Sequence, residues 1–95
     1  MTKVNKIEEL VQEELKEANE IHPAFASDHE AFAVVLEELE ECEEELEACE
    51  RHLNSIWKNT KQDLDTHALY YYLKQYAIRL AQEAIQLAAM ADKAM

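Results

Sequence analysis

The chain has no glycine and one proline, Pro23, among its 95 residues. Tight β-turns draw on glycine and proline for their backbone angles, so this scarcity argues against a multi-stranded sheet. Leu, Ala, Glu, Gln and Lys dominate instead, and these residues favour helices. We therefore expect a single all-α domain over residues 1–95, built as an antiparallel bundle of three main helices.

Basic residues are also scarce, because 9 Lys and Arg face 21 Asp and Glu, for a net charge of −12. That charge argues against nucleic acid or an anionic membrane as a partner. No apolar run is long enough to span a bilayer, and the charged N-terminal segment shows no secretory signal. The two cysteines, Cys42 and Cys49, are about 10.5 Å apart along a helix, too far for an intrachain disulfide. We expect a cytoplasmic protein with reduced cysteines.

The first two helices have clear boundaries. Apolar periodicity predicts a helix over Lys3–Glu20, ended by the dipeptide His22-Pro23 because the residue before a proline resists the α conformation. Ser27 and Glu30 form a capping-box pattern that opens the second helix. Its apolar residues recur at steps of four and three, like a coiled-coil seam, and we expect them to face the core. They are Phe32, Leu36, Leu39, Cys42, Leu46, Cys49, Leu53 and Ile56, and the helix is predicted to end at Ile56 or Lys58.

The polar segment Asn59–His67 is predicted to be a connection, with Asp65 or Thr66 capping a third helix that reaches Asp92 or beyond. From Tyr76 to Met90 this helix is apolar on nearly every side. Such a helix is normally buried on every side, and a three-helix monomer cannot surround it. We therefore expect the bundle to be completed by oligomerisation, as a homodimer or a homotetramer.

The segment "VVLEELEECEEELEAC" carries eight glutamates. Among them, Glu38 and Glu41 share one helix face and lie at the edge of the predicted core. In an antiparallel pair these two face Glu83 and Gln86 near the end of the third helix. Three carboxylates and an amide oxygen then converge, a ligand set that suits Mg²⁺ or Mn²⁺. The simpler alternative is a salt bridge from Glu83 to Arg79, or to an arginine or lysine elsewhere.

Two motifs, "EELEE" at residues 37–41 and "EAIQ" at residues 83–86, resemble those of the MazG-like all-α nucleoside triphosphate pyrophosphohydrolases. The segments that contain these motifs, "HPAFASDHEAFAVVLEELEE" and "LAQEAIQLAAMA", are similar to the sequences of a small phage- and prophage-associated branch of that superfamily. The family pattern is E-E-x-x-E on one helix and E-x-x-D on the next, so Gln86 stands where the family has aspartate.

The resemblance implies Mg²⁺-dependent hydrolysis of a nucleoside triphosphate to a monophosphate and pyrophosphate. Glu38, Glu41 and Glu83 would be the catalytic metal ligands, with Gln86 in the fourth place. Residue type alone suggests further substrate contacts, with Lys58, Lys61 and Arg79 at phosphates and Trp57 or a tyrosine stacking on a base. The competing hypothesis is a non-enzymatic acidic helical oligomer, a structural or interaction protein whose glutamates are solvated.

Overall fold

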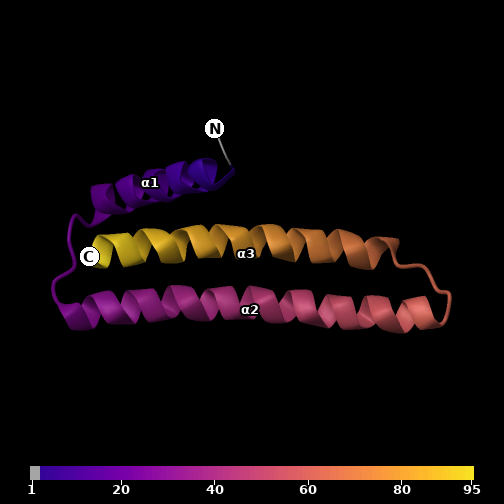
Figure 1. Ribbon diagram of the computed structural model, residues 1–95. Coiled ribbons are helices and arrows are strands. Elements are labelled where there is room, and N and C mark those ends of the chain that lie inside the picture. The colour runs from indigo at the N-terminus through magenta and orange to yellow at the C-terminus, as the bar shows by residue number, and fades with distance from the viewer. Residues whose placement is uncertain (1–2) are drawn as a thin grey trace.

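The computed structural model describes residues 3–95, which form three α-helices and no β-strand (Figure 1). Helix α1 spans Lys3–Ile21, α2 spans Asp28–Lys61 and α3 spans His67–Ala94. Helices α2 and α3 run antiparallel as a long hairpin, and α1 lies on the opposite side of α3 from α2 (Figure 1). Helix α1 contacts α3 but not α2. The predicted all-α class and the packed helical arrangement are confirmed.

The helix starts and stops follow the local signals. The chain leaves α1 at Ile21, immediately before His22-Pro23, and the His22 N–H donates to the Ala18 carbonyl at 2.9 Å. Ser27 is the N-cap of α2, and its Oγ accepts from the Glu30 N–H at 3.1 Å, as predicted.

The connection between α2 and α3 is shorter than predicted, because α2 continues to Lys61 rather than ending at Ile56 or Lys58. Asn59 stabilises the turn that follows: its carbonyl accepts from the Leu64 N–H at 2.8 Å, and its Nδ2 donates to the Asp65 carbonyl at 2.9 Å. Asp63 supplies the left-handed residue of this turn, with φ of 54°. Thr66 is the N-cap residue of α3 and makes no side-chain cap hydrogen bond, while Asp65 Oδ1 accepts from the His67 N–H at 3.1 Å.

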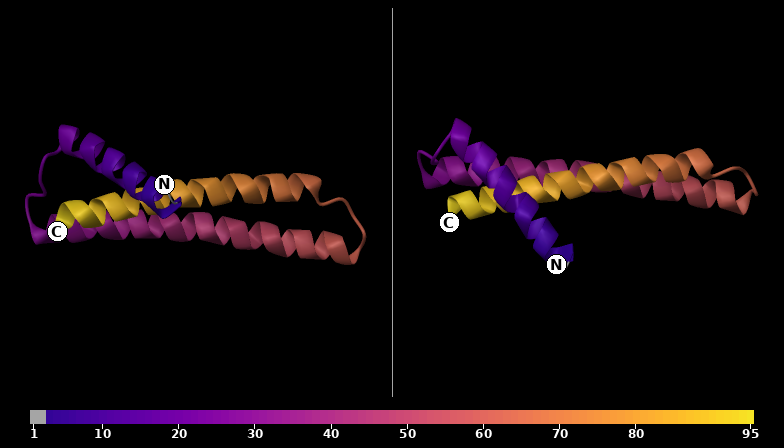
Figure 2. Two further views of the ribbon diagram at one scale, coloured as in Figure 1. Left: turned by 45° about the horizontal axis from the view of Figure 1, so that its top comes forward. Right: turned by 90° about the horizontal axis from the view of Figure 1, so that it is seen from above.

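Helix α1 crosses α3 obliquely (Figure 2). Ile7 and Val11 of α1 and alanines 81, 84 and 88 of α3 line one apolar hollow between the two helices. Gln12 Nε2 donates to Asp92 Oδ2 at 3.1 Å. Near the end of α3, Lys93 lies over the ring of Phe25 at 4.6 Å and donates to the His22 carbonyl. These contacts hold α1 and the following segment to the C-terminal half of α3.

The core is thin. Its buried apolar side chains, within the described residues, are Ala31, Ala48, Ile56 and Ala89. The molecule measures 54 × 34 × 18 Å, with a radius of gyration of 17.1 Å. A compact domain of this length has a radius of gyration of about 12.4 Å. A single chain is therefore an elongated, shallow structure that leaves much of its apolar surface uncovered.

The α2 seam expected in the core is only partly there, and this corrects the prediction. Ile56 is buried and Cys42 and Cys49 are half-buried. Six other apolar residues of α2, which we call the leucine stripe, are 40–69% exposed: Phe32, Leu36, Leu39, Leu46, Leu53 and Trp57.

The cause of this exposure is the position of the apolar residues on the helix. Ala31, Glu38, Glu45 and His52 recur every seven residues and are buried or half-buried against the rest of the chain. Phe32, Leu39, Leu46 and Leu53 each follow one of them by one residue, which turns their side chains about 100° away from that face. Half-buried Glu38, Glu41 and Glu45 therefore occupy the α3-facing positions instead.

Helix α3 lies between the other two helices but is not enclosed by them. Between Tyr76 and Met90, Ala77, Ile78, Ala81, Ala84 and Ala88 remain exposed. The other two helices therefore do not surround this apolar part of α3 within one chain, and its burial by oligomerisation stays a prediction. None of the described helices combines the length and the apolar character needed to cross a bilayer.

Candidate metal centre

Three glutamate side chains from two helices meet in the α2–α3 seam. Glu38 and Glu41 lie one turn apart on α2, and the antiparallel hairpin brings Glu83 of α3 against them. One carboxylate oxygen from each of the three lies within 4.8 Å of the others. All three side chains are half-buried. The structure thus brings together the three acids that the sequence placed on facing helices.

The electrostatics of this cluster are unfavourable when all three acids are ionised. The pKa of Glu38 is raised from 4.5 to about 7, first by burial and then by the charges of Glu41 and Glu83. The pKa of Glu83 is also raised, first by burial and then by hydrogen bonding to Glu41 and by its charge. Without a cation, the cluster therefore retains protons near neutral pH that an isolated glutamate would release.

Gln86 closes the cluster from α3. With its amide nitrogen turned to the acids, it donates to Glu38 Oε2 at 3.1 Å and to Glu83 Oε2 at 3.2 Å. The opposite amide orientation would set its carbonyl oxygen against the same carboxylate oxygens and repel them. An amide can therefore bridge the acids in the absence of a cation and, after rotation, present an oxygen to a cation. An ionised aspartate at this position could not donate such hydrogen bonds to the acids.

Glu45 is a further acid at this site. Its Oε2 is buried and has no hydrogen-bond partner. It lies one turn beyond Glu41, and its charge contributes to the raised pKa of Glu83. The sequence analysis did not include Glu45 among the candidate ligands. Its spacing of seven residues from Glu38, which repeats the same helix face, was the available signal.

The donor set fits a hard divalent cation. All available atoms are carboxylate or amide oxygens, which Mg²⁺ and Mn²⁺ prefer, and the unpartnered Glu45 oxygen adds a further acceptor. Cys42 lies beside the acids, and the pKa of its thiol is raised by burial and then by Glu83 and Glu38. A thiol that stays protonated is a poor metal ligand, so the site is not suited to a softer ion. Both cysteines are free, as the spacing predicted.

Arg79 does not neutralise the cluster. Its guanidinium lies over the Tyr76 ring at 5.2 Å, one turn before Glu83. Across residues 3–95, no ion pair joins Arg79 to Glu83, so the salt bridge to Arg79 considered as the simpler alternative is not formed. Arg79 is nevertheless the predicted phosphate contact that lies closest to the acids along the chain.

The other predicted substrate contacts lie elsewhere. Trp57 follows Glu41 by sixteen residues on the same helix, which places it about 24 Å away along the axis. Lys58 and Lys61 lie beyond it, and Lys61 Nζ sits over the Trp57 ring at 5.5 Å. The structure does not bring these three side chains to the acids of the same chain.

Helix α1 contributes a surface that the sequence did not predict at the site. A groove of about 440 Å³ runs between α1 and α3 and borders the cluster at Glu83 and Gln86. Its volume falls within the usual range of small-molecule sites. Three α1 glutamates, Glu13, Glu14 and Glu17, line its other wall. An anionic ligand in this groove would therefore need cations to accompany it.

Comparisons of the chain with protein-family models, curated proteins and solved structures found no match. The resemblance to the MazG-like superfamily therefore rests on the two acidic motifs and their flanking residues.

Proposed function

We propose that the chain binds Mg²⁺ or Mn²⁺ through Glu38, Glu41 and Glu83, with Gln86 in the fourth place, and uses the bound cation to hydrolyse a nucleoside triphosphate to a monophosphate and pyrophosphate. The observation that supports this most is the convergence of the three carboxylates within 4.8 Å, with the Gln86 amide donating to two of them. The identity of the reaction rests on the resemblance of "EELEE" and "EAIQ" to the family motifs.

A divalent cation at this position would polarise phosphoryl oxygens and activate a water molecule. The chain's own residues would hold that cation from both sides of the seam, because α2 supplies two carboxylates and α3 supplies the third. Binding requires Glu38 and Glu83 to lose the protons that their raised pKa values retain. Cation affinity is therefore expected to rise with pH across the neutral range.

The α1–α3 groove is the place we assign to the rest of the substrate, since it adjoins Glu83 and Gln86. Its glutamates repel phosphate, and this makes the proposed activity strictly cation-dependent. Arg79 is the predicted phosphate contact on the same helix as Glu83, where it would have to leave the Tyr76 ring to reach a ligand.

A pyrophosphate-release screen over canonical and modified nucleoside triphosphates tests the proposal. We expect release of pyrophosphate, rather than of orthophosphate, in Mg²⁺ or Mn²⁺ and none in chelator. Glu41→Gln should abolish it, while Glu47→Gln, which removes the same charge from an exposed position of α2, should not. Background release with every nucleotide in both metals would contradict the enzymatic assignment.

A non-enzymatic oligomer is the second candidate, and the exposed leucine stripe favours it. In that case the acids would serve only a structural cation or remain solvated. Thermal unfolding with and without Mn²⁺ helps to separate the candidates. A stabilising shift that Glu83→Gln removes, together with background nucleotide hydrolysis, would indicate a structural cation site.

A further inference from the structure

Charge is unevenly distributed along the chain. Residues 51–79, which we call the cationic segment, carry five of the nine basic residues and two of the 21 acids, for a net charge of +3. The rest of the chain carries −15, since the whole carries −12. All four tyrosines and the single tryptophan of the sequence also lie in this segment. The net charge of the whole chain therefore does not describe what a ligand meets here.

The cationic segment forms the end of the α2–α3 hairpin that stands clear of α1. It includes the last part of α2, the connection and the first part of α3. Helix α1, which carries six glutamates, lies over the other end of α3 (Figure 1). His52 and Tyr72 each lie eleven residues from an acid of the cluster, Glu41 and Glu83 respectively, or about 16.5 Å along their helices. That is about two Debye lengths at physiological ionic strength, so salt largely screens the charge of the cluster there.

A continuous array of side chains in ring contact lies in this segment. The His52 ring contacts two tyrosines of α3, with centroids 5.0 Å from Tyr76 and 6.0 Å from Tyr72. Tyr71 packs edge-on against Tyr72 at 5.5 Å, and the Arg79 guanidinium lies over the Tyr76 ring at 5.2 Å. We call these five residues the aromatic array. Because half-buried His52 and Tyr76 are packed between the helices, they hold the more exposed rings in place.

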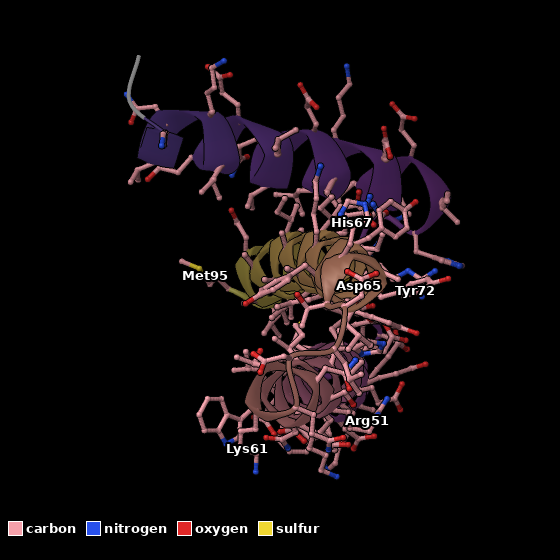
Figure 3. All side chains as sticks on the ribbon, turned by 90° about the vertical axis from the view of Figure 1, so that its right-hand side faces the viewer. Arg51, Lys61, Asp65, His67, Tyr72 and Met95 are labelled. Atoms are coloured by element: carbon pink, nitrogen blue, oxygen red, sulfur yellow. The ribbon has the colours of Figure 1, made fainter. Side chains whose placement is uncertain are left out.

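The outer rings of the aromatic array are exposed and lie among cations. Tyr71 and Tyr72 are 55% and 51% exposed. Arg51 extends from the same side of the hairpin as Tyr72 in the end-on view (Figure 3). Lys58 follows Arg51 by seven residues, so it has the same direction to within about 20°, and both are exposed. Together with Arg79, three cations therefore flank the rings on this side, which we call the Arg51 side.

This combination favours single-stranded nucleic acid over other polyanions. Bases of a single strand stack on exposed aromatic rings while arginine and lysine neutralise the phosphates. The bases of a duplex are already stacked on one another, and acidic peptide side chains have no rings to stack. An anionic membrane fits less well, because Asp63 and Asp65 lie at the tip of the hairpin whereas the aromatic array runs along its side. The surface ends at Glu47, one turn before Arg51, where the acids of α2 begin.

We propose that the Arg51 side of the cationic segment binds single-stranded nucleic acid. The bases stack on Tyr71 and Tyr72. The phosphates lie at Arg51, Lys58 and Arg79. Because every base has a face that can stack, this binding does not select a sequence. The interaction needs no divalent cation, so it stands or falls separately from the proposed hydrolysis.

Fluorescence anisotropy of a labelled twelve-nucleotide oligothymidylate, in chelator, tests the proposal. The wild type should bind it saturably at 50 mM NaCl. Raising NaCl to 200 mM should weaken binding roughly 20-fold, because three phosphate contacts on a single strand give a slope of about −2 between the logarithms of affinity and salt. Tyr72→Leu should weaken binding about fivefold or more, as expected for the loss of one stacked base.

Tyr70→Leu is the matched control for the stacking residue. Tyr70 is 53% exposed, and it precedes Tyr72 by two residues, which directs it about 160° away around α3. This variant should bind the oligonucleotide as the wild type does. Both substitutions are at exposed positions, and helical circular dichroism checks that each variant is folded. Equal losses of affinity for Tyr72→Leu and Tyr70→Leu would overturn the proposal, as would the absence of saturable binding by the wild type.

Arg51→Gln tests the phosphate contacts independently of the rings. It should weaken binding and reduce the salt slope by about 0.7. Lys16→Gln, which removes the same charge from an exposed position of α1, should change neither. A duplex of the same length, poly-glutamate and anionic phospholipid vesicles should all bind more weakly than the single strand. If any of these three binds as tightly as the oligonucleotide, the proposal is overturned, because stacking of unpaired bases then contributes nothing.

Discussion

Replacing Glu38 by glutamine should stabilise the cation-free protein at high pH and leave it unchanged at low pH. The reason is that the pKa of Glu38 is raised in the folded chain from 4.5 to about 7. Below about pH 4.5 the side chain is protonated in both the folded and unfolded states. Above about pH 7 it is ionised in both, and the folded state bears the cost of its burial and of its neighbours' charges. The free energy of unfolding therefore falls as the pH rises through this window.

The magnitude follows from the two pKa values. Each pH unit between them is worth about 1.36 kcal/mol, so the two pKa values set an upper bound of about 3.4 kcal/mol. Glu38 is only partly buried, and water screens the charges around it. We therefore expect a difference between Glu38→Gln and the wild type on the order of 1–2 kcal/mol at pH 8. For a domain of this size, that corresponds to roughly 4–16 °C in melting temperature.

Thermal unfolding followed by circular dichroism measures this difference at fixed protein concentration, at pH 4.5 and pH 8, in chelator. Glu47→Gln is the control, because it removes the same charge from an exposed position of α2. Adding Mn²⁺ at pH 8 should reverse the order, since the wild type gains a ligand that Glu38→Gln holds poorly. If Glu38→Gln is no more stable than Glu47→Gln at pH 8 in chelator, both the raised pKa of Glu38 and the unfavourable electrostatics of the acid cluster are refuted.

Three other results are expected. Gln86→Asp replaces the amide that bridges Glu38 and Glu83 with a fourth carboxylate. This substitution should lower the melting temperature in chelator and raise the affinity for Mn²⁺. An unchanged melting temperature would show that the bridge contributes nothing to stability. Because Asp63 has a φ of 54°, Asp63→Ala should lower the free energy of unfolding by about 1 kcal/mol in chemical denaturation, and Asp63→Gly should not. Equal free energies for the two variants would contradict the left-handed turn. Raising NaCl from 20 to 300 mM should strengthen self-association, since each chain carries −12, and weaker association in salt would indicate a polar interface.

Local sequence signals were sufficient for most helix boundaries. The Ser27 cap, the His22-Pro23 stop and the hydrogen bond of the Asp65 side chain at the start of α3 all act within a few residues, and the structure has each of them. The end of α2 was missed because Asn59, a residue typical of turns, instead completes the last helical turn and bonds the connection from there. A strong capping residue does not by itself show on which side of the boundary it lies.

The meeting of Glu38, Glu41 and Glu83 was predictable because it needs only two antiparallel helices joined by a short turn. The degree of burial was harder to foresee. Leu39 and Leu46 each follow a half-buried glutamate by one residue, so Glu38 and Glu45 meet α3 and the two leucines stay exposed. Glu45 was left out of the ligand set although it repeats the helix face of Glu38 seven residues later.

The groove between α1 and α3 depends on a crossing angle that periodicity does not encode. Helical spacing along α1 could not show that Glu13, Glu14 and Glu17 would lie across a groove from Glu83. The substrate contacts assigned from residue type, Trp57, Lys58 and Lys61, had no spatial argument behind them. Their distance from the acids along α2 shows why charge and aromaticity alone are weak guides to a site.

Direct titration with Mn²⁺, followed by electron paramagnetic resonance of the free ion, tests the central claim that acids from two helices form one cation site. At pH 8 the wild type should bind Mn²⁺ saturably, and Mg²⁺ should compete for the same site. Glu83→Gln, which changes only the α3 side of the cluster, should weaken binding by roughly tenfold or more. Equal Mn²⁺ binding by Glu83→Gln and the wild type would contradict the claim, because the α2 acids alone would then account for the ion.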